Sequence, residues 1–322
     1  GIMSPVMVAL WLLAGFLCAE LLLRARHRTL DLARPTELRP ETRQLRPEQT
    51  RAAFSIVCLG DSNTFGEALS FEQAFPALLE ALLRSKSPGP DMVVVNAGIR
   101  GNTAVMGLER LTTDVLAYRP RIVISAFGAN DGHLGEWPLD NCREQQMTHR
   151  TTPLGRLEAW LLQSHLLLSL RTRLSRTRRP ASDAASAALG DGASQPRVSL
   201  QGFALAQRLI ADRLRRAGCS VLFMTSTVPN PAWTNLVAAE QHQASVYEQF
   251  NETVRTLADE LAVPLIDLQK LLQQQTPSDS ATLIAPDAVH LTAKGHRFAA
   301  ELVLETIQRS GLLPDDSTEA EQ

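Results

Sequence analysis

Five short apolar runs, each separated from the next by a segment with helical spacing, constrain the fold of this chain most strongly. The runs are 54–59 (FSIVCL), 92–96 (MVVVN), 122–127 (IVISAF), 220–225 (SVLFMT) and 263–266 (VPLI). Short, continuous apolar runs are typical of strands that are buried on both faces of a parallel sheet. Their alternation with helices predicts a three-layer α/β/α sandwich around a five-stranded parallel sheet, connected by right-handed crossovers.

Helical periodicity predicts the segments that connect these strands. The expected helices are 71–84, 103–118, 154–174, 201–217, 239–261 and 294–308. The stretch 175–195 is rich in Ala, Ser, Arg and Gly and has no periodicity, so we expect a flexible surface insertion there. One domain is therefore expected over 52–312, followed by a disordered acidic tail over 313–322.

The first 23 residues have the composition of a membrane span. Residues 5–23 contain a single charged residue, Glu20, and would form about 28 Å of helix, close to the hydrocarbon thickness of a bilayer. A basic cluster at 24–28 follows at once and suits a membrane interface. We therefore expect a single-pass transmembrane anchor over 1–23. The alternatives are a buried core helix and a cleaved signal peptide, although no small-x-small cleavage site follows the run.

Residues 24–51 have the composition of a solvated tether. They include eight Arg, four acidic residues and three Pro, with little apolar periodicity. By the positive-inside rule, the basic cluster after the apolar run favours a cytoplasmic position for the main domain. Cys18 follows Phe16 and Leu17, which suit a lipid-attachment motif poorly, so we do not expect a lipoprotein anchor.

Charge and cysteine usage exclude several classes of protein. Lys and Arg total 32 against 34 Asp and Glu, so the chain has no basic footprint for nucleic acid. The four cysteines are scattered, which excludes a disulfide scaffold and a paired-cysteine zinc site. We find no Gly-rich phosphate loop, dinucleotide fingerprint or helical metal pair. We therefore expect no cofactor, no metal and no nucleic-acid partner.

Polar residues lie where ligands bind in parallel sheets, beyond the carboxyl ends of the strands. The segments 60–63 (GDSN), 96–103 (NAGIRGNT) and 128–131 (GAND) follow the first three strands, and 287–290 (DAVH) precedes the last helix. Each segment alone is ordinary turn chemistry. Together they supply an alcohol, an imidazole, a carboxylate and amide donors, which is the set that acyl transfer needs.

Chemistry suggests a role for each group. The hydroxyl of Ser62 is a poor nucleophile unless a base takes its proton, and imidazole, here His290, has an ordinary pKa near neutral pH. Asp287 lies three residues earlier and can orient the ring. The candidate oxyanion donors are the Ser62 N–H, the Asn130 side chain and the N–H of a glycine in 96–103, where Gly101 and Gly98 are rivals.

In their order and spacing, 60–63, Gly101 within 99–103, 128–131 and 287–290 resemble the four sequence blocks of the SGNH (GDSL-type) hydrolase superfamily. The resemblance covers about residues 52–312. It implies the flavodoxin-like SGNH hydrolase fold and favours Gly101 over Gly98 as the oxyanion donor. The insertion at 175–195 departs from the family pattern and leaves the substrate contacts open.

The expected function is that of a membrane-anchored serine esterase that works through an acyl-enzyme and hydrolyses a small-molecule, glycan or lipid ester. The alternatives are an O-acetyltransferase or deacetylase acting on a cell-envelope glycan, or a non-catalytic binding module on the same fold. The resemblance implies that the domain lies on the extracytoplasmic, periplasmic side, whereas the basic cluster favours the cytoplasmic side. The oligomeric state is left open.

Several neighbouring residues are expected to support the site rather than react. We expect Asp61 and Asp131 to bond backbone amides of their own turns. His296 is expected to be structural, and His133 to be an exposed loop residue or a residue of the pocket. Thr64 stands where the Gly-x-Ser-x-Gly elbow needs glycine, so Ser62 is expected on a more open turn.

Overall fold

Five parallel strands form the central sheet, as the alternation predicts: β1 (Phe54–Gly60), β2 (Met92–Gly98), β3 (Ile122–Ala126), β6 (Ser220–Met224) and β7 (Leu265–Ile266). Their order is β2-β1-β3-β6-β7, so the direction of winding reverses between β1 and β3. The carboxyl ends of these two neighbouring strands therefore border the crevice in which open α/β sheets bind ligands. The register pairs Gly60 with Gly98 on one side and with Ala126 on the other.

The computed structural model describes residue 41 and residues 54–86, 92–154, 195–228, 238–275 and 282–314. The chain divides into two units, and the one made of Glu37–Glu144 and Ser194–Gln322 contains the whole sheet. The anchor expected over 1–23 lies outside the described residues. So do the tether apart from residue 41, nearly all of the expected helix 154–174 and insertion, and most of the tail. No helix in the described part of the chain is long and apolar enough to cross a bilayer.

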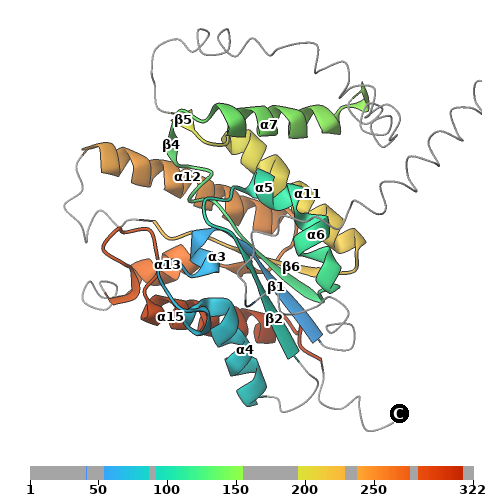
Figure 1. Ribbon diagram of the computed structural model, residues 1–322, viewed down its shortest axis with the longest axis vertical. Helices are drawn as coiled ribbons and strands as arrows, with labels where there is room; N and C mark the ends of the chain where they lie inside the picture. The colour runs from blue at the N-terminus through green and yellow to red at the C-terminus, as the bar shows by residue number, and fades with distance from the viewer. Residues whose placement is uncertain are drawn as a thin grey trace, which may run out of the picture. The chain divides into compact units, whose positions relative to one another are not determined.

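Helices cover both faces of the sheet (Figure 1). One layer contains α4 (Phe75–Lys86) and α15 (Ala293–Arg309), which pack against each other. The other contains α5 (Ala104–Glu109), α11 (Leu200–Arg216) and α12 (Ala238–Glu260). The remaining elements are α3 (Ser62–Phe65), η2 (Phe71–Gln73), α6 (Leu111–Asp114), η3 (Leu116–Tyr118), α7 (Pro138–Thr151), α13 (Leu268–Gln273) and a small antiparallel pair, β4 (Leu134–Gly135) with β5 (Gln195–Pro196).

The strands are buried because helices pack on both of their faces. Ile56, Val57, Cys58 and Leu59 of β1 are all fully buried. Beneath α4 and α15 the core is mainly aliphatic. On the opposite face of the sheet, the rings of Phe203 in α11 and Phe250 in α12 pack edge to face, with their centroids 5.1 Å apart. This continuous burial holds the ends of β1, β2 and β3 in place and makes their loops a rigid frame.

The single helix expected over 103–118 is wrong. The chain forms α5, α6 and η3 there, separated at Arg110 and Val115. The Arg110 guanidinium donates to the carbonyl oxygens of Gly60 and Ala97, at 3.2 and 2.6 Å. That tertiary contact, together with β-branched residues of low helix propensity at 112, 113 and 115, overrides the apolar spacing.

Besides the one-turn helix α3, two helices were not anticipated from the sequence. α7 follows β4, where the periodicity predicts no helix, and α13 follows the last strand. α7 is strongly polar, so it has no apolar stripe to reveal it. Its start at Pro138 is nevertheless a recognisable signal, because proline is favoured in the first turn of a helix.

Candidate active site

Ser62 begins the one-turn helix α3 directly after β1. Asp61 caps this helix, because its Oδ1 accepts a hydrogen bond from the Asn63 N–H at 2.9 Å. The turn ends at Gly66, whose φ of 82° is readily adopted only by glycine. Ser62 itself is not among the described residues with positive φ. The nucleophile candidate therefore sits on an open turn, not on a strained elbow.

Asp287 and His290 lie on a short loop that precedes α15. The backbone N–H groups of Val289 and His290 both donate to Asp287 Oδ1, at 3.0 and 2.9 Å. Asp287 Oδ2 lies 2.8 Å from His290 Nδ1, and His290 Nε2 lies 2.9 Å from Ser62 Oγ. The fold thus brings the three side chains into one chain of hydrogen bonds across 228 residues of sequence.

This arrangement lies on an open rim of the molecule. The side chain of His290 is 25% exposed and that of Asp287 is 52% exposed. Burial alone would raise the pKa of the Asp287 carboxyl, but hydrogen bonds from the His290 backbone and ring and from Val289 outweigh it and hold that pKa below its usual value. Asp287 is therefore ionised at neutral pH and suited to hold a proton on His290 Nδ1.

The two rival glycines have different structural roles. A Cβ on Gly98 would lie 2.2 Å from the Phe65 nitrogen, so this glycine permits the close approach of α3 to β2. Gly101 has a φ of +70°, and a Cβ there would meet no described atom within 4 Å. No described residue accepts the N–H of Ser62 or Gly101. Both amides are therefore free to bind an oxyanion.

Asn130 and Asp61 interact at the end of β3. The Asn130 side chain hydrogen-bonds the Asp61 carboxylate and so helps to keep it ionised. Burial is the larger effect and raises the pKa of Asp61 to about 6. The hydrogen bonds donated by Asn63 and Asn130 and the charge of His290 lower this pKa but do not offset burial. Asp61 thus serves its own turn, as expected, and also holds a side chain from the neighbouring strand end.

Asp131 reaches beyond the turn in which it was expected to stay. In addition to its own backbone amide, it accepts a hydrogen bond from the N–H of Ala104, at 2.8 Å, and so links the loop after β3 to the start of α5. The carboxyl is fully buried, and burial raises its pKa to about 7. The nearby charge of Asp61 acts in the same direction.

The pattern of motifs and strand ends is matched by a known family. The model of the GDSL-like lipase/acylhydrolase family matches residues 58–298. The chain belongs to this family of ester hydrolases. The match spans β1 to α15, and therefore every residue placed in the site above.

Individual relatives cover different parts of this GDSL-family chain. The thioesterase 1/protease 1/lysophospholipase L1 of Escherichia coli K12 is 34% identical over 115 residues, which are 36% of this chain and 53% of the relative. The chain thus spans about half the length of the first curated relatives that it matches. An uncharacterized lipoprotein of Bacillus subtilis, YqeF, is 23% identical over 282 residues, which are 82% of this chain and 91% of that protein.

Among solved structures, the lipase/acylhydrolase from Enterococcus faecalis superposes with a TM-score of 0.51 at 18% identity. The superposition covers 80% of this chain and 96% of the other. At that identity the likeness concerns the fold. It agrees with the five-stranded parallel sheet described above.

The loop after β6 contributes to the site of this GDSL-family chain, and the sequence reasoning missed it. Ser226 Oγ accepts the N–H of Ala129 at 3.2 Å, next to Asn130. Asn251 of α12 binds both the N–H and the carbonyl of Ser226, at 2.8 and 2.9 Å. The rule that singled out the ends of the other strands would have found Ser226 and Thr227, because they directly follow the fourth predicted strand.

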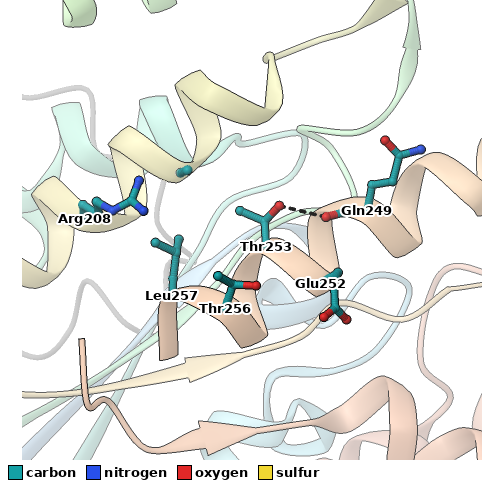
Figure 2. A pocket seen from close by; sticks show the side chains of 7 residues that line it. Arg208, Gln249, Glu252, Thr253, Thr256 and Leu257 are labelled. Atoms are coloured by element: carbon teal, nitrogen blue, oxygen red, sulfur yellow. Dashed lines mark hydrogen bonds between the residues drawn. The ribbon is translucent and has the colours of Figure 1, made fainter. Parts of the chain in front are cut away.

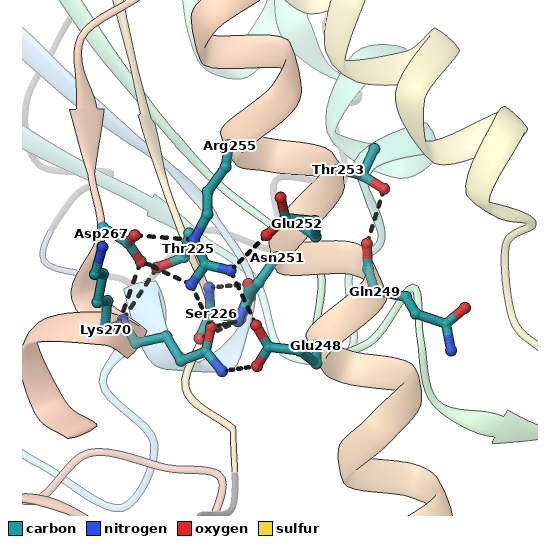
Figure 3. A network of polar contacts seen from close by, with 11 residues as sticks. Thr225, Ser226, Glu248, Gln249, Asn251, Glu252, Thr253, Arg255, Asp267 and Lys270 are labelled. Atoms are coloured by element: carbon teal, nitrogen blue, oxygen red, sulfur yellow. Dashed lines mark hydrogen bonds and ion pairs between the residues drawn. The ribbon is translucent and has the colours of Figure 1, made fainter.

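A polar network anchors α12 behind this loop (Figure 3). Arg255 binds both oxygens of Asp267, at 2.9 and 3.0 Å, and also bonds Gln269 and Glu248. The hydrogen bonds that Arg255 donates to Asp267 favour the charged guanidinium and raise the pKa of Arg255. The network fixes the helix from which Asn251 reaches Ser226, so its contribution to the site is indirect.

His133 and Trp137, which lie beyond β3, pack against each other edge to face with their ring centroids 5.8 Å apart. His133 is exposed, and its Nδ1 lies 3.1 Å from the hydroxyl of Tyr247. Trp137 carries the guanidinium of Arg197 over its ring at 4.7 Å, and Arg197 pairs with Asp140 at 2.9 Å and donates to the Gly101 carbonyl at 3.0 Å. Arg197, itself held by Trp137 and Asp140, thus links this cluster to the loop of Gly101.

His296 is structural, as expected. It is buried, and its Nδ1 accepts the N–H of Phe75 at 3.1 Å. Within the described ranges no group of three His, Cys, Asp or Glu side chains could hold a metal ion.

A groove with a volume of about 250 Å³ lies between α11 and α12 (Figure 2). Its walls include Arg208 and Leu257, with Thr253 and Gln249 along α12. None of its lining residues belongs to the hydrogen-bonded chain of Ser62, His290 and Asp287.

Proposed function

We propose that this chain is a serine esterase or acylhydrolase in which Ser62, His290 and Asp287 form the catalytic triad. The observation that carries the proposal is the continuous hydrogen-bonded chain from Asp287 Oδ2 through the His290 ring to Ser62 Oγ. Membership of an ester-hydrolase family supports the reaction class. No cofactor is needed for this chemistry.

The reaction follows from the order of the three groups. Ser62 Oγ attacks the ester carbonyl carbon while His290 Nε2 takes the hydroxyl proton, and Asp287 stabilises the resulting imidazolium. Collapse of the tetrahedral intermediate breaks the bond to the alcohol oxygen, which receives the proton from His290. Water then repeats the sequence on the acyl-enzyme, with Ser62 Oγ as the leaving group.

The oxyanion of each tetrahedral intermediate is bound by the N–H groups of Ser62 and Gly101 and by the Asn130 side-chain amide. The free amides of Ser62 and Gly101 support this assignment, as does the position of Asn130 at the end of β3, beside β1. Asp61 and Asp131 support the site by holding Asn130 and the start of α5. Such donors are commonly worth 10²–10³-fold in kcat each, roughly.

Replacing Ser62 by Ala tests the proposal directly. Ser62→Ala should abolish hydrolysis of p-nitrophenyl acetate and labelling by a fluorophosphonate, because both need the Oγ nucleophile. Ser85→Ala removes an exposed serine of α4 and is the matched control, expected to behave as the wild type. Unchanged turnover by Ser62→Ala would refute the triad. A wild-type protein that is neither active nor labelled would favour a binding module.

The acyl acceptor decides between a hydrolase and an acetyltransferase. The same triad could pass an acetyl group to a sugar hydroxyl of a cell-envelope glycan in place of water. Incubating the enzyme with an acetyl ester and a glycan, and measuring acetyl transfer against acetate release, separates these outcomes. We propose water as the acceptor, so acetate should predominate.

We also propose that residues 1–23 anchor the protein to a membrane and that the catalytic domain over 52–312 lies on its periplasmic side, joined by the tether over 24–51. The support is the apolar run in the sequence and a relative whose name describes a lipoprotein. The full chain should remain in the membrane fraction after a carbonate wash, and a chain that begins at Arg51 should not. A topology reporter fused after Gln322 tests the side.

A further inference from the structure

We propose that Asn63 is a positioning residue, which holds His290 on the nucleophile by binding the backbone on both sides of it. Asn63 Nδ2 donates to the Val289 carbonyl at 3.1 Å, and Asn63 Oδ1 accepts the N–H of Leu291 at 3.1 Å. Val289 and Leu291 are the two chain neighbours of the catalytic base. This inference rests on the proposed triad and adds a residue to its support.

The contacts of Asn63 use both halves of its amide. The NH₂ group also donates to Thr227 Oγ1 at 3.3 Å, and the Thr227 hydroxyl in turn donates to the Val289 carbonyl. Asn63 is only 9% exposed and Thr227 is fully buried, so these bonds form where water competes little. An amide suits this position because a carboxylate would face the Val289 carbonyl and an aliphatic side chain would leave the Leu291 N–H without a partner.

The loop at 284–291, which carries His290 and is called the base loop below, needs such support because its own backbone conformation is unfavourable. Ala288 has a φ of 59°, which costs a residue other than glycine free energy and persists only where surrounding contacts impose it. Within the loop, the N–H of Ala285 donates to the His290 carbonyl at 2.7 Å, but that bond does not reach the nucleophile. Asn63 joins the loop to α3, which carries Ser62.

Because Asn63 adjoins Ser62 in the chain, it couples the position of the nucleophile to the position of the base. The capped turn sets the position of Ser62 Oγ, and the side chain of the next residue sets the backbone of His290. A shift of the ring by about 1 Å can cost about 10²-fold in rate. Asn63 should therefore affect the catalytic step more than substrate binding.

The test compares Asn63→Leu and Asn63→Asp with Gln207→Leu, each made in the full chain of 322 residues. Gln207 is as deeply buried, and its amide oxygen accepts a hydrogen bond from Ser125 with no link to the base loop, so its replacement is a matched loss of a buried amide. Each protein is assayed with p-nitrophenyl acetate for kcat and KM. The rate and end-point of fluorophosphonate labelling and the thermal midpoint are also measured.

Both Asn63 variants should lose about 10–10²-fold in kcat with KM changed less than threefold, and should be labelled more slowly to the same end-point, since a misplaced base activates Ser62 poorly. Gln207→Leu should lower the thermal midpoint and leave kcat per labelled site unchanged. If the Asn63 variants keep wild-type kcat per labelled site, the positioning role is refuted. Should they fail to fold, Thr227→Val gives the same test with a smaller expected loss, and wild-type kcat in that variant would refute the role.

The controls separate this proposal from the triad itself. Activity remaining in Ser62→Ala removes the proposed function and the inference with it. An inactive Ser62→Ala beside fully active Asn63 variants removes the inference alone.

Discussion

The nucleophile turn at 60–66 and the base loop at 284–291 are held in different ways, although they form one site. The turn continues a buried strand, is capped by Asp61 and ends in a glycine. The loop is partly exposed, contains Ala288 in a left-handed conformation and is tied to the turn by side chains from elsewhere. We therefore expect changes to the packing of the turn to affect folding, and changes to the side-chain contacts of the loop, including those made by Asn63, to affect rate.

The largest expected effect of a substitution in the base loop is that of Asp287→Asn. The amide keeps the Oδ1 acceptor for the backbone of Val289 and His290, but its NH₂ group faces His290 Nδ1 and favours the wrong tautomer. We expect kcat to fall by up to about 10⁴-fold. Steady-state kinetics with p-nitrophenyl acetate measure this change.

The thermal midpoint of Asp287→Asn should stay near that of the wild type, because the loop bonds remain. Asp212→Asn, on the exposed face of α11, is the control and should be fully active. An Asp287→Asn enzyme within tenfold of wild-type kcat would show that the carboxylate does not orient the base.

At the end of β2, where the nucleophile turn packs, Gly98→Ala should act on folding first. The added Cβ would lie 2.2 Å from the Phe65 nitrogen and 2.6 Å from the Thr64 carbonyl carbon, so the backbone of α3 must move. We expect the free energy of unfolding to fall by about 1–3 kcal/mol, as for other overpacked sites. Urea unfolding measures the loss.

Activity distinguishes this clash from a general loss of stability. Gly218→Ala, at a φ of +81° with open space around the Cβ, should cost about 1–2 kcal/mol through backbone strain alone. Gly218→Ala should keep wild-type kcat, while Gly98→Ala should lose activity because Ser62 moves with α3. Equal activity in the two variants would contradict a role for Gly98 in placing the turn.

The last comparison concerns Asp131, which joins two loops of the frame. Its folded-state pKa of about 7 lies above the ordinary value of 3.8, so the folded protein keeps a proton that the unfolded chain releases. The free energy of unfolding that this group contributes must therefore fall as pH rises from about 4 to about 7. Asp131→Asn keeps an oxygen acceptor for Ala104 and removes the titration.

Urea unfolding near pH 5 and near pH 8 tests this expectation for the wild type and Asp131→Asn. Between pH 5 and pH 8 the free energy of unfolding of the wild type should fall relative to that of Asp131→Asn, because only the wild type must ionise a buried carboxyl at position 131. A difference between the two proteins that is independent of pH would show that Asp131 is already ionised at the lower value.

Much of this molecule could be predicted from local patterns. The strands appeared as apolar runs, and the expected helices after residue 200 lie within a residue of those observed, because their amphipathic stripes face one large core. Where a distant contact competes with local preference the prediction failed. Arg110 breaks the helix expected over 103–118 because it reaches carbonyls at the ends of β1 and β2.

The candidate site divides in the same way. The strand-end rule pointed to Ser62, Asn130 and the loop of Gly101, since parallel strands place their carboxyl ends along one edge. It did not reveal that Asn251 binds Ser226, because nothing in a helix sequence marks a side chain that reaches a distant loop.

By itself, the sequence determined the class of fold, the order of the strands along the chain and the residues able to perform acyl transfer, because periodicity and motif order are local properties. Only the tertiary structure decided which groups meet: the distance from His290 to Ser62, the separate roles of Gly98 and Gly101, and the hold of Asn63 on the base loop. The physical reason is that a hydrogen bond depends on ångström-scale position, and positions between residues far apart in the chain are set by the packing of the whole core.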